Sequence, residues 1–149
     1  MSTPEKVTPQ IAAVEAIMAA WRDRRIEPVL DRLHDDIEFT YAIGKRPMVG
    51  KERIRGLLEF LQTHQRDVQW RTVHRAQTGD VVFVEGVDDF VNPDGHHVRT
   101  PHVTVFEFEG DEVIRWRDYY DQRQMEAAEA GEPSSEWLLP LVAPDRGRR

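Results

Sequence analysis

The chain contains no cysteine among its 149 residues, which excludes disulfides, thiolate zinc sites and cysteine nucleophiles. It also lacks any apolar run near the roughly 20 residues that a membrane-spanning helix requires, so no membrane partner is expected. An excess of positive charge is missing too, because the formal net charge is -7, and this argues against a nucleic-acid partner. The N-terminal residues have no apolar segment typical of a signal peptide, and we therefore expect a cytoplasmic protein.

The sequence does contain enough apolar material for one domain with a real core. Hydrophobic residues make up 40% of the chain, and its length suits a single domain. We expect this domain to span residues 9–143, with a disordered lead-in at 1–8 and a disordered basic tail at 144–149. An apolar cluster at 137–142 is expected to dock over an open edge or mouth of the sheet.

Helical periodicity dominates the first part of the chain and strand alternation the second. A helix is expected from Thr8 and Pro9, which suit a cap and a first helical position, and further helices at 27–33 and 51–64. A strand at 37–41 separates the last two, and four more follow near 68–77, 80–91, 96–108 and 112–121, before a weak helix at 125–130. This order predicts an α+β, cone-shaped fold in which N-terminal helices pack on a curved, mostly antiparallel sheet that encloses a pocket.

The strand at 112–121 carries the most informative pattern. Because side chains alternate across a strand, its core-facing side carries Ile114, Trp116, Asp118 and Tyr120. An aspartate among large apolar residues is costly to bury unless it is paired or used, and burial would raise its pKa and make it a better base. In the alternative interpretation, Asp118 only satisfies a hydrogen bond or lies at the rim of the sheet.

The Asn-Pro-Asp-Gly turn at 92–95 predicts the register of the neighbouring strands. If Asn92 pairs with His96 across this turn, the pairs that follow are Asp88 with Thr100 and Gly86 with His102. A three-residue loop in the next hairpin places Phe108 opposite Ile114 and Thr104 opposite Asp118. Side chains of Asp88, His102 and Asp118 should then meet on the concave face of three adjacent strands.

Two carboxylates beside an imidazole form a plausible acid–base arrangement. Repulsion between the carboxylates lets one stay protonated as the acid while the other serves as the base. The imidazole of His102 could hold both in place, or carry the proton itself near neutral pH. Two other interpretations stay open: His102 is a hydrogen-bonded core histidine, or Asp88 merely caps a bulge.

Other polar residues are weaker candidates. Tyr41 shares the inward face of its strand and could donate a hydrogen bond to a ligand oxygen, or be a core tyrosine with a polar tip. His96 and His97 are adjacent in a strand and point to opposite faces, so no metal site is expected there. Glu85 and Asp89 fall on the outer face, where we expect solvated charges.

The order of the elements, the segment 33–41 and above all Trp-Arg-Asp-Tyr-Tyr-Asp at 116–121 resemble the nuclear-transport-factor-like superfamily. Within it the chain is most similar to the limonene-1,2-epoxide hydrolase group, with SnoaL-like polyketide cyclases and ketosteroid isomerases as cousins. In those hydrolases one aspartate deprotonates water, a second protonates the epoxide oxygen, and an arginine bridges them. The resemblance therefore implies that Asp118 activates water and that Asp88 is the acid.

The chain also departs from the pattern of the hydrolases. Their triad arginine falls on Gly86, and the tyrosine and asparagine that hold the water fall on Phe39 and Tyr41. The base position of the ketosteroid isomerases falls on Tyr41 as well. Because His102 is expected to face Gly86, its imidazole could fill the space of the missing guanidinium, and such a bridge should titrate near neutral pH.

These patterns predict an acid–base enzyme for a small hydrophobic oxygenated substrate, and the resemblance implies a cofactor-independent reaction, most concretely the opening of an epoxide by one-step attack of water. Its expected catalytic residues are Asp118, Asp88 and His102, and its expected substrate-binding residues are Phe39, Tyr41, Phe90, Thr100, Trp116 and Tyr120. A cyclase or isomerase using the same carboxylates is one alternative. The missing arginine favours another, a non-catalytic protein that binds small ligands on the same fold.

A homodimer is also expected from the resemblance. The outer face of the sheet is the surface through which the two copies would meet. Val103, Val105 and Tyr119 form an odd-numbered stripe on that face, which is compatible with such an interface.

Overall fold

The computed structural model describes residues 6–144. Over this range the chain forms the helices α1 (Pro9–Arg22), α2 (Glu27–Leu30), α3 (Lys51–His64), α4 (Gln122–Glu129) and α5 (Leu139–Val142). Its strands are β1 (Leu33–Thr40), β2 (Met48–Val49), β3 (Arg71–Thr78), β4 (Val81–Val91), β5 (His97–Glu109) and β6 (Glu112–Tyr120). None of the described helices is both long and apolar enough to cross a membrane.

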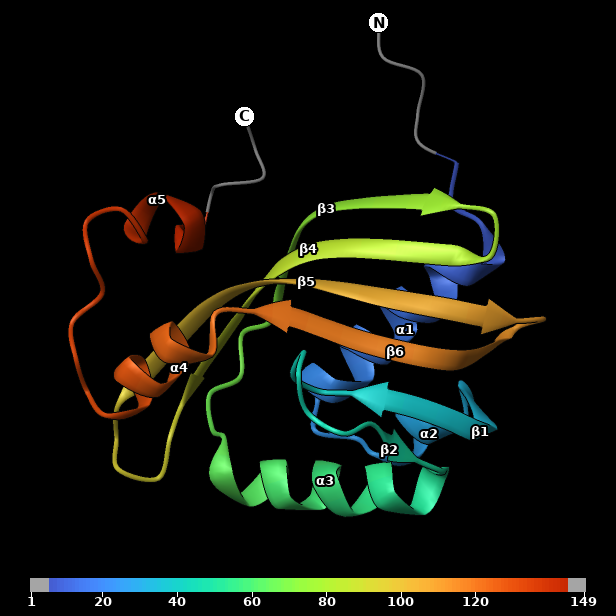
Figure 1. The fold of residues 1–149 in the computed structure, drawn as a ribbon, viewed down its shortest axis with the longest axis horizontal. Coiled ribbons are helices and arrows are strands. Elements are labelled where there is room, and N and C mark those ends of the chain that lie inside the picture. Colours follow the sequence, from blue (N-terminus) through green and yellow to red (C-terminus); the bar gives the residue numbers. More distant parts are fainter. Residues whose placement is uncertain (1–5, 145–149) are drawn as a thin grey trace, which may run out of the picture.

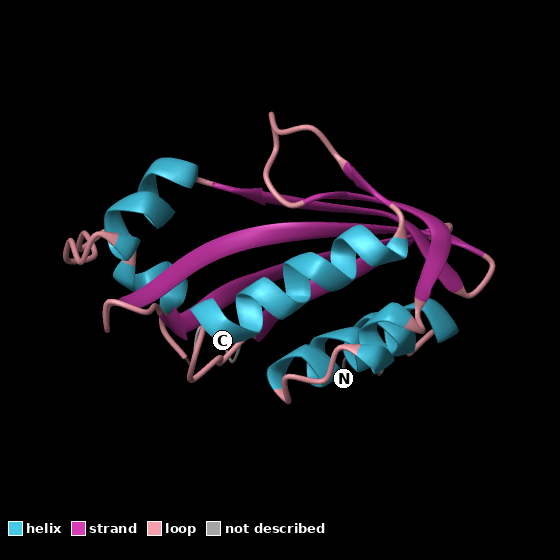
Figure 2. Ribbon diagram, turned by 90° about the horizontal axis from the view of Figure 1, so that it is seen from below, coloured by secondary structure: helices cyan, strands magenta, loops and turns pink. Residues whose placement is uncertain are grey.

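The strands of residues 6–144 form one six-stranded sheet in the order β2-β1-β6-β5-β4-β3. Only the β1–β6 pair is parallel within this sheet, and every other described pair is antiparallel. The sheet is curved, and α1, α2 and α3 gather on its concave side (Figures 1 and 2). The expected α+β fold with a mostly antiparallel curved sheet is confirmed.

The helices α1, α2 and α3 begin where the sequence places them, because the local signals are strong, whereas the helix expected at 125–130 begins earlier, at Gln122. Thr8 caps α1: its hydroxyl oxygen accepts a hydrogen bond from the backbone N–H of Ile11 at 3.1 Å. The buried face of α1 then packs into the main core, to which Ile17 and Trp21 contribute large side chains. The predicted helix at 51–64 is α3, and its buried Ile54 belongs to the same core.

The first strand differs from the expectation. The helix predicted at 27–33 ends at Leu30, and the strand predicted at 37–41 is longer and begins at Leu33. Leu33 pairs with Val113 of β6 and both are fully buried, so tertiary pairing overrides the local helical signal. β1 ends at Thr40, so Tyr41 lies just after the strand rather than within it.

The β4–β5 hairpin has the expected register because one side chain fixes the conformation of its turn. The carboxamide oxygen of Asn92 accepts a hydrogen bond from the backbone N–H of His96 at 2.9 Å, and the two residues also pair through their backbones. Gly95 supplies the positive φ, 84°, that the turn requires. The pairs farther along the ladder are the expected ones: Asp88 with Thr100 and Gly86 with His102.

The β5–β6 hairpin reaches the expected pairing of Thr104 with Asp118 through a bulge that was not expected. Its register shifts once between Phe108, which pairs with Val113, and Glu107, which pairs with Arg115. Ile114 is thus the extra residue of a bulge, and Val113 takes the buried place predicted for Ile114. Beyond the bulge the strands pair in the predicted register, so Thr104 does lie opposite Asp118.

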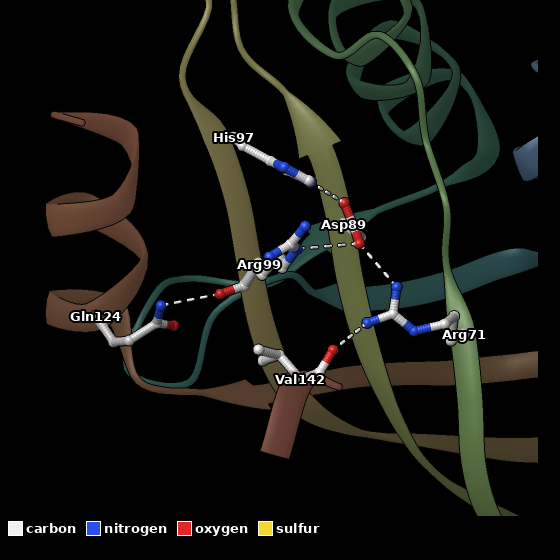
Figure 3. A network of polar contacts seen from close by, with 6 residues as sticks. All are labelled: Arg71, Asp89, His97, Arg99, Gln124 and Val142. Atoms are coloured by element: carbon white, nitrogen blue, oxygen red, sulfur yellow. Dashed lines mark hydrogen bonds and ion pairs between the residues drawn. The ribbon is translucent and has the colours of Figure 1, made fainter. Parts of the chain in front are cut away.

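On the outer face, Asp89 corrects the expectation of a solvated charge, because its side chain is only 7% exposed. Arg71 donates to it at 2.7 Å, Arg99 lies 3.5 Å away, and His97 contacts its other oxygen (Figure 3). Burial of this carboxylate is tolerated because basic side chains surround it. Arg71 also donates to the backbone carbonyl of Val142, which ties α5 to the outer face near the edge strand β3.

The stripe proposed for a dimer interface is only partly exposed. Val103 and Tyr119 are 38% and 43% exposed, whereas Val105 is buried at 5%. The homodimer stays a prediction. Of the apolar cluster at 137–142, Val142 is buried and Trp137 is exposed. The predicted lead-in and tail lie largely outside the described residues, which begin at 6 and end at 144.

Candidate active site

A cavity of about 290 Å³ lies between the helices and the concave face of the sheet. Most of its lining is apolar, and side chains of α1, α2 and α3 form much of it, including Trp21, Val29, Ile54, Leu57, Leu58, Phe60 and Leu61. The sheet and the residue after β1 contribute Asp88, Asp118 and five of the expected substrate-binding side chains: Phe39, Tyr41, Phe90, Trp116 and Tyr120. A mainly apolar hollow with a few convergent polar groups is typical of a small-molecule site.

Two hydrogen bonds hold the carboxylate of Asp118. The hydroxyl of Thr104 and the indole N–H of Trp116 both donate to its Oδ1, at 2.7 and 3.1 Å. Trp116 is itself fixed by tilted aromatic contacts, with ring centroids 4.7 Å from Phe39 and 4.9 Å from Phe106. The base candidate of the sequence analysis is therefore held rigidly at the cavity wall.

The electrostatic surroundings of Asp118 raise its pKa to about 6. Burial is the largest cause, because it disfavours the charged form, and the nearby charge of Asp88 adds to it. The charge of His102 and the two hydrogen bonds oppose the rise. Such a carboxylate is ionised at neutral pH and is a stronger base than an exposed aspartate.

His102 lies behind the cavity wall with its side chain 6% exposed. Its Nε2 forms an ion pair with Oδ1 of Asp88 at 3.2 Å, and its Nδ1 lies 3.1 Å from the hydroxyl oxygen of Thr104. Burial by itself lowers the pKa of His102, but the charges of Asp88 and Asp118 and the contact with Asp88 together raise it to about 9. The histidine is therefore an imidazolium at neutral pH, held between two carboxylates.

This pKa corrects one expectation of the sequence analysis. A histidine in place of the arginine was expected to titrate near neutral pH, but the flanking carboxylates move its titration up to about 9. Over the physiological range His102 therefore carries the same positive charge as an arginine. It differs from arginine in one respect, since an imidazolium with this pKa can release its proton.

Contacts thus connect all three predicted catalytic side chains, from Asp88 through His102 and Thr104 to Asp118. The sequence analysis placed Thr104 opposite Asp118 but assigned it no role. The available signal was its position on the same inward face as His102, two residues away. What could not be read from the sequence was the rotation of the hydroxyl group that connects its two neighbours.

The lack of a side chain at Gly86 leaves room for the imidazole of His102. A Cβ atom built on Gly86 would lie 2.9 Å from Nε2 of His102 and 2.6 Å from the backbone oxygen of Arg71. The imidazole therefore packs directly against the glycine, in the space that a side chain at position 86 would otherwise need. A side chain at position 86 could therefore be placed only if the imidazole of His102 and the backbone at Arg71 moved.

We expect Gly86→Ala to lower the free energy of unfolding by about 1 to 3 kcal/mol, the usual range for an overpacked core. Denaturant unfolding of the purified variant measures it. The double variant Gly86→Ala with His102→Ala should stay destabilised, because the contact with the backbone oxygen of Arg71 remains. A Gly86→Ala variant as stable as the parent would contradict this packing.

Thr100 and Tyr120, two of the expected ligand contacts, differ in whether they reach the cavity. Thr100 is fully buried, its hydroxyl has no partner among the described residues, and it does not line the cavity, although Asp88 opposite it does. Tyr120 does line the cavity, and burial together with the charges of Asp118 and Asp88 raises its pKa to about 12. Its phenol therefore keeps its proton and is available as a hydrogen-bond donor.

Several site features could not be taken from sequence periodicity. The apolar residues of α3 were seen only as a helix face, and Met125 and Glu129 of α4 were not considered, yet all of these elements line the cavity. Within residues 6–144 no group of three histidine, aspartate or glutamate side chains is arranged to hold a metal ion.

These features define a class of protein: a cone-shaped α+β fold with acid–base groups at an apolar cavity. The SnoaL-like domain family model matches residues 14–116, and the chain therefore belongs to the SnoaL-like family. Comparison with curated proteins finds no match.

Solved structures of known proteins have the same fold. An LEH-like epoxide hydrolase from M. tuberculosis is 26% identical, with a TM-score of 0.73 over 94% of this chain and 99% of its own. A protein with a ketosteroid isomerase-like fold from Catenulispora acidiphila, in complex with trimethylamine, is 25% identical with a TM-score of 0.71, covering 89% and 96%. A putative SnoaL-like polyketide cyclase from Shewanella putrefaciens is 18% identical with a TM-score of 0.75, covering 84% and 98%. The last of these likenesses concerns the fold alone.

Proposed function

We propose that this protein hydrolyses small hydrophobic epoxides by general acid–base catalysis. The observation that carries the proposal is the connected set of Asp88, His102 and Asp118, two of which line a mainly apolar cavity. The likeness to an epoxide hydrolase of M. tuberculosis supports it. The match of Trp-Arg-Asp-Tyr-Tyr-Asp at 116–121 to the hydrolase pattern supports it as well.

In the proposed reaction Asp118 takes a proton from a water molecule, whose oxygen attacks one carbon of the epoxide. As the new C–O bond forms, the C–O bond to the epoxide oxygen breaks. That oxygen receives a proton from Asp88, and the product is a vicinal diol. Every proton moves between side chains of this chain, water and substrate, so the step calls for no cofactor.

The proton that Asp88 donates comes from its ion pair with His102. Nε2 of the imidazolium and Oδ1 of Asp88 are 3.2 Å apart in an ion pair, and transfer of the Nε2 proton to the carboxylate leaves neutral imidazole and protonated Asp88. An arginine in the same place would hold the carboxylate but would not give up a proton. Asp88 and His102 therefore form one acid, and Tyr120 and Tyr41 are auxiliary donors to the ligand oxygen.

The pH dependence follows from the two raised pKa values. Below about pH 6 Asp118 becomes protonated and can no longer act as the base, so kcat should fall. Above about pH 9 His102 loses its proton and the acid is lost, so kcat should fall again. We expect a plateau between these limits, measured by initial rates from pH 4 to 11. A single maximum near pH 7 with midpoints close to it would contradict the assignment of His102.

The proposal is tested with a panel of apolar epoxides of about ten heavy atoms, with diol formation followed by chromatography. A single turnover in ¹⁸O-labelled water, with enzyme in excess over substrate, separates two mechanisms. Direct attack by water places the label in the diol of the first turnover. Attack by an aspartate oxygen would instead give unlabelled diol first, because the carboxylate supplies that oxygen, and would overturn the proposed step.

Two other functions would give different results with the same protein. A cyclase or isomerase using the same carboxylates would exchange or isomerise an enolisable ketone and leave the epoxides intact. A non-catalytic binding protein would bind apolar ligands in the cavity and turn over neither substrate. Because the raised pKa of Asp118 suits removal of a proton from carbon as well as from water, the ketone panel belongs in the same experiment.

A further inference from the structure

A second cavity, which we call the outer cavity, adjoins the cavity that Asp88 and Asp118 line. It measures about 500 Å³ and lies between the end of α3, the β4–β5 turn and the end of α4. Asp88 and Asp118 do not line it, so the proposed reaction keeps the epoxide in the first cavity. The remainder of a longer substrate would extend toward the residues that line both cavities, which are Phe60, Leu61, Gln65, Phe90 and Glu129.

Carboxylates are the main charged groups in the walls of both cavities. Those of Asp88, Asp118 and Glu129 line the first cavity, and those of Glu129 and Asp94 line the outer one. Within residues 6–144 no lysine or arginine side chain lines either cavity, and His64 is the only basic residue that does so. A bound ligand therefore meets negative charge in both cavities.

Two positive charges outside the lining offset part of this negative charge. His102 is paired with Asp88, and the guanidinium of Arg24 donates to the backbone carbonyls of Leu61 and Gln65 at 2.9 and 2.8 Å. These are two cations against four carboxylates, or three cations if His64 is protonated as well. The sum is negative in both cases, and the two cavities therefore favour a ligand that carries positive charge.

The walls shared by the two cavities also contain aromatic rings. Phe60 is 54% exposed although its side chain is large and apolar, and its ring centroid lies 3.7 Å from that of His64. Phe90 lines the same space from β4. The face of an aromatic ring attracts a cation, and aromatic walls are a common means of binding an ammonium group. The rings and the carboxylates thus favour the same kind of ligand.

Glu129 is held in place through its backbone. Its carbonyl oxygen accepts hydrogen bonds from the side-chain amide of Asn92 at 2.9 Å and from Nδ1 of His96 at 2.8 Å. The pKa of Glu129 is raised, mainly because burial disfavours its charged form and also because of the charge of Glu126. A ligand cation would stabilise this incompletely solvated carboxylate. Glu129 is nevertheless exposed, so the cation would keep part of its own hydration.

We propose that the substrate carries an organic cation, a protonated amine or a quaternary ammonium group, at the end remote from the epoxide. Glu129 and the ring of Phe60 bind this cation where the two cavities adjoin. The inference rests on the proposed function, because it names the substrate class of the same site. Glu129 and Phe60 are residues that determine specificity in this proposal and take no part in the chemical step.

Three ligands of equal chain length test the proposal without any turnover: octylammonium, 1-octanol and octanoate. Their dissociation constants are measured at neutral pH by isothermal titration calorimetry with the whole protein. We expect octylammonium to bind about fivefold or more tightly than 1-octanol, since an exposed ion pair and a cation–π contact each contribute modestly. Octanoate should bind most weakly, because the carboxylates repel it.

Glu129→Gln should weaken the binding of octylammonium about threefold or more and leave that of 1-octanol unchanged. Its backbone contacts with Asn92 and His96 do not involve the side chain and remain. Glu126→Gln is the matched control, because it removes a charge from the same helix at a residue that lines neither cavity. The control should keep the preference of the parent. Phe60→Leu keeps an apolar side chain, removes the ring and should also reduce the preference for octylammonium.

Catalysis supplies a second test, with two terminal epoxides that differ only at the far end. One carries a trimethylammonium group and the other a tert-butyl group, which has the same shape and no charge. We expect kcat/KM to be about fivefold higher for the cationic epoxide, with the difference in KM, because the cation binds equally well in the ground state and the transition state. In Glu129→Gln this difference should shrink.

Equal binding of the three octyl ligands, no binding of any of them, or a preference for octanoate would overturn the inference. A preference for octylammonium that persists in both Glu129→Gln and Phe60→Leu would also overturn it, because the cation would then bind elsewhere. Failure of the proposed function gives a different result. The protein would convert neither epoxide, while the Glu129-dependent preference for octylammonium would remain.

Discussion

Asp118→Asn is expected to reduce epoxide turnover by about a thousandfold or more and to leave the fold intact. The amide cannot take a proton from water, and the loss of a general base costs about 10²–10⁴ in rate. Its carbonyl oxygen can still accept the hydrogen bonds of Thr104 and Trp116, so the side chain keeps its place. The measurement is kcat/KM for an epoxide that the parent protein converts.

The control for this variant is Asp121→Asn, three residues farther along the chain. Asp121 caps α4, accepting hydrogen bonds from the backbone N–H groups of Arg123 and Gln124, and asparagine caps a helix equally well. Its kcat/KM should match that of the parent. Near-ultraviolet circular dichroism and binding of an apolar ligand check that Asp118→Asn is folded. If that folded variant keeps more than a tenth of the activity, Asp118 is not the base.

His102→Gln is expected to lower kcat by about a hundredfold or more on the pH plateau. Glutamine fills similar space and forms hydrogen bonds, but it carries neither the charge nor the transferable proton of the imidazolium. The variant should also shift the acid limb of any remaining activity. Because the charge of His102 lowers the pKa of Asp118, its removal should move that limb above about pH 6.

The matched control is His97→Gln, on the same strand but on the outer face. His97 contacts Asp89 and lies outside the cavity lining, so this change should leave kcat and its pH limbs as they are. Full kcat in His102→Gln would show that the histidine supplies no proton. An acid limb that does not move would show that its charge does not act on Asp118.

Some of the site was predictable because short-range rules determine it. Side chains alternate along a strand, and the Asn92 turn fixes which residues of β4 and β5 are opposite each other. These two rules were enough to place His102 against Gly86 and to bring Asp88 to the same face. The β5–β6 hairpin shows the limit of these rules, since the bulge at Ile114 altered the predicted pairing near the turn but left Asp118 opposite Thr104.

Other features were not predictable because they depend on residues distant in sequence. Asp89 was assigned to solvent, but Arg71 from the edge strand and His97 from the next strand surround it in the folded chain. The titration of His102 was expected near neutral pH, and the two carboxylates that raise its pKa to about 9 come from β4 and β6. The burial of a side chain and the charges around it depend on all of its neighbours in the folded chain, so no local sequence pattern predicts them.

The sequence by itself determined the order of the main helices and strands, the inward face of β4 and β5, and the three acid–base residues of the site. Periodicity and turn chemistry act over a few residues, which is why these could be read directly. Only the tertiary structure decided which side chains line the cavity, how Thr104 connects His102 to Asp118, and how far each pKa moves. Those properties depend on the distances between separate strands and helices, and these distances are determined by the packing of the folded chain.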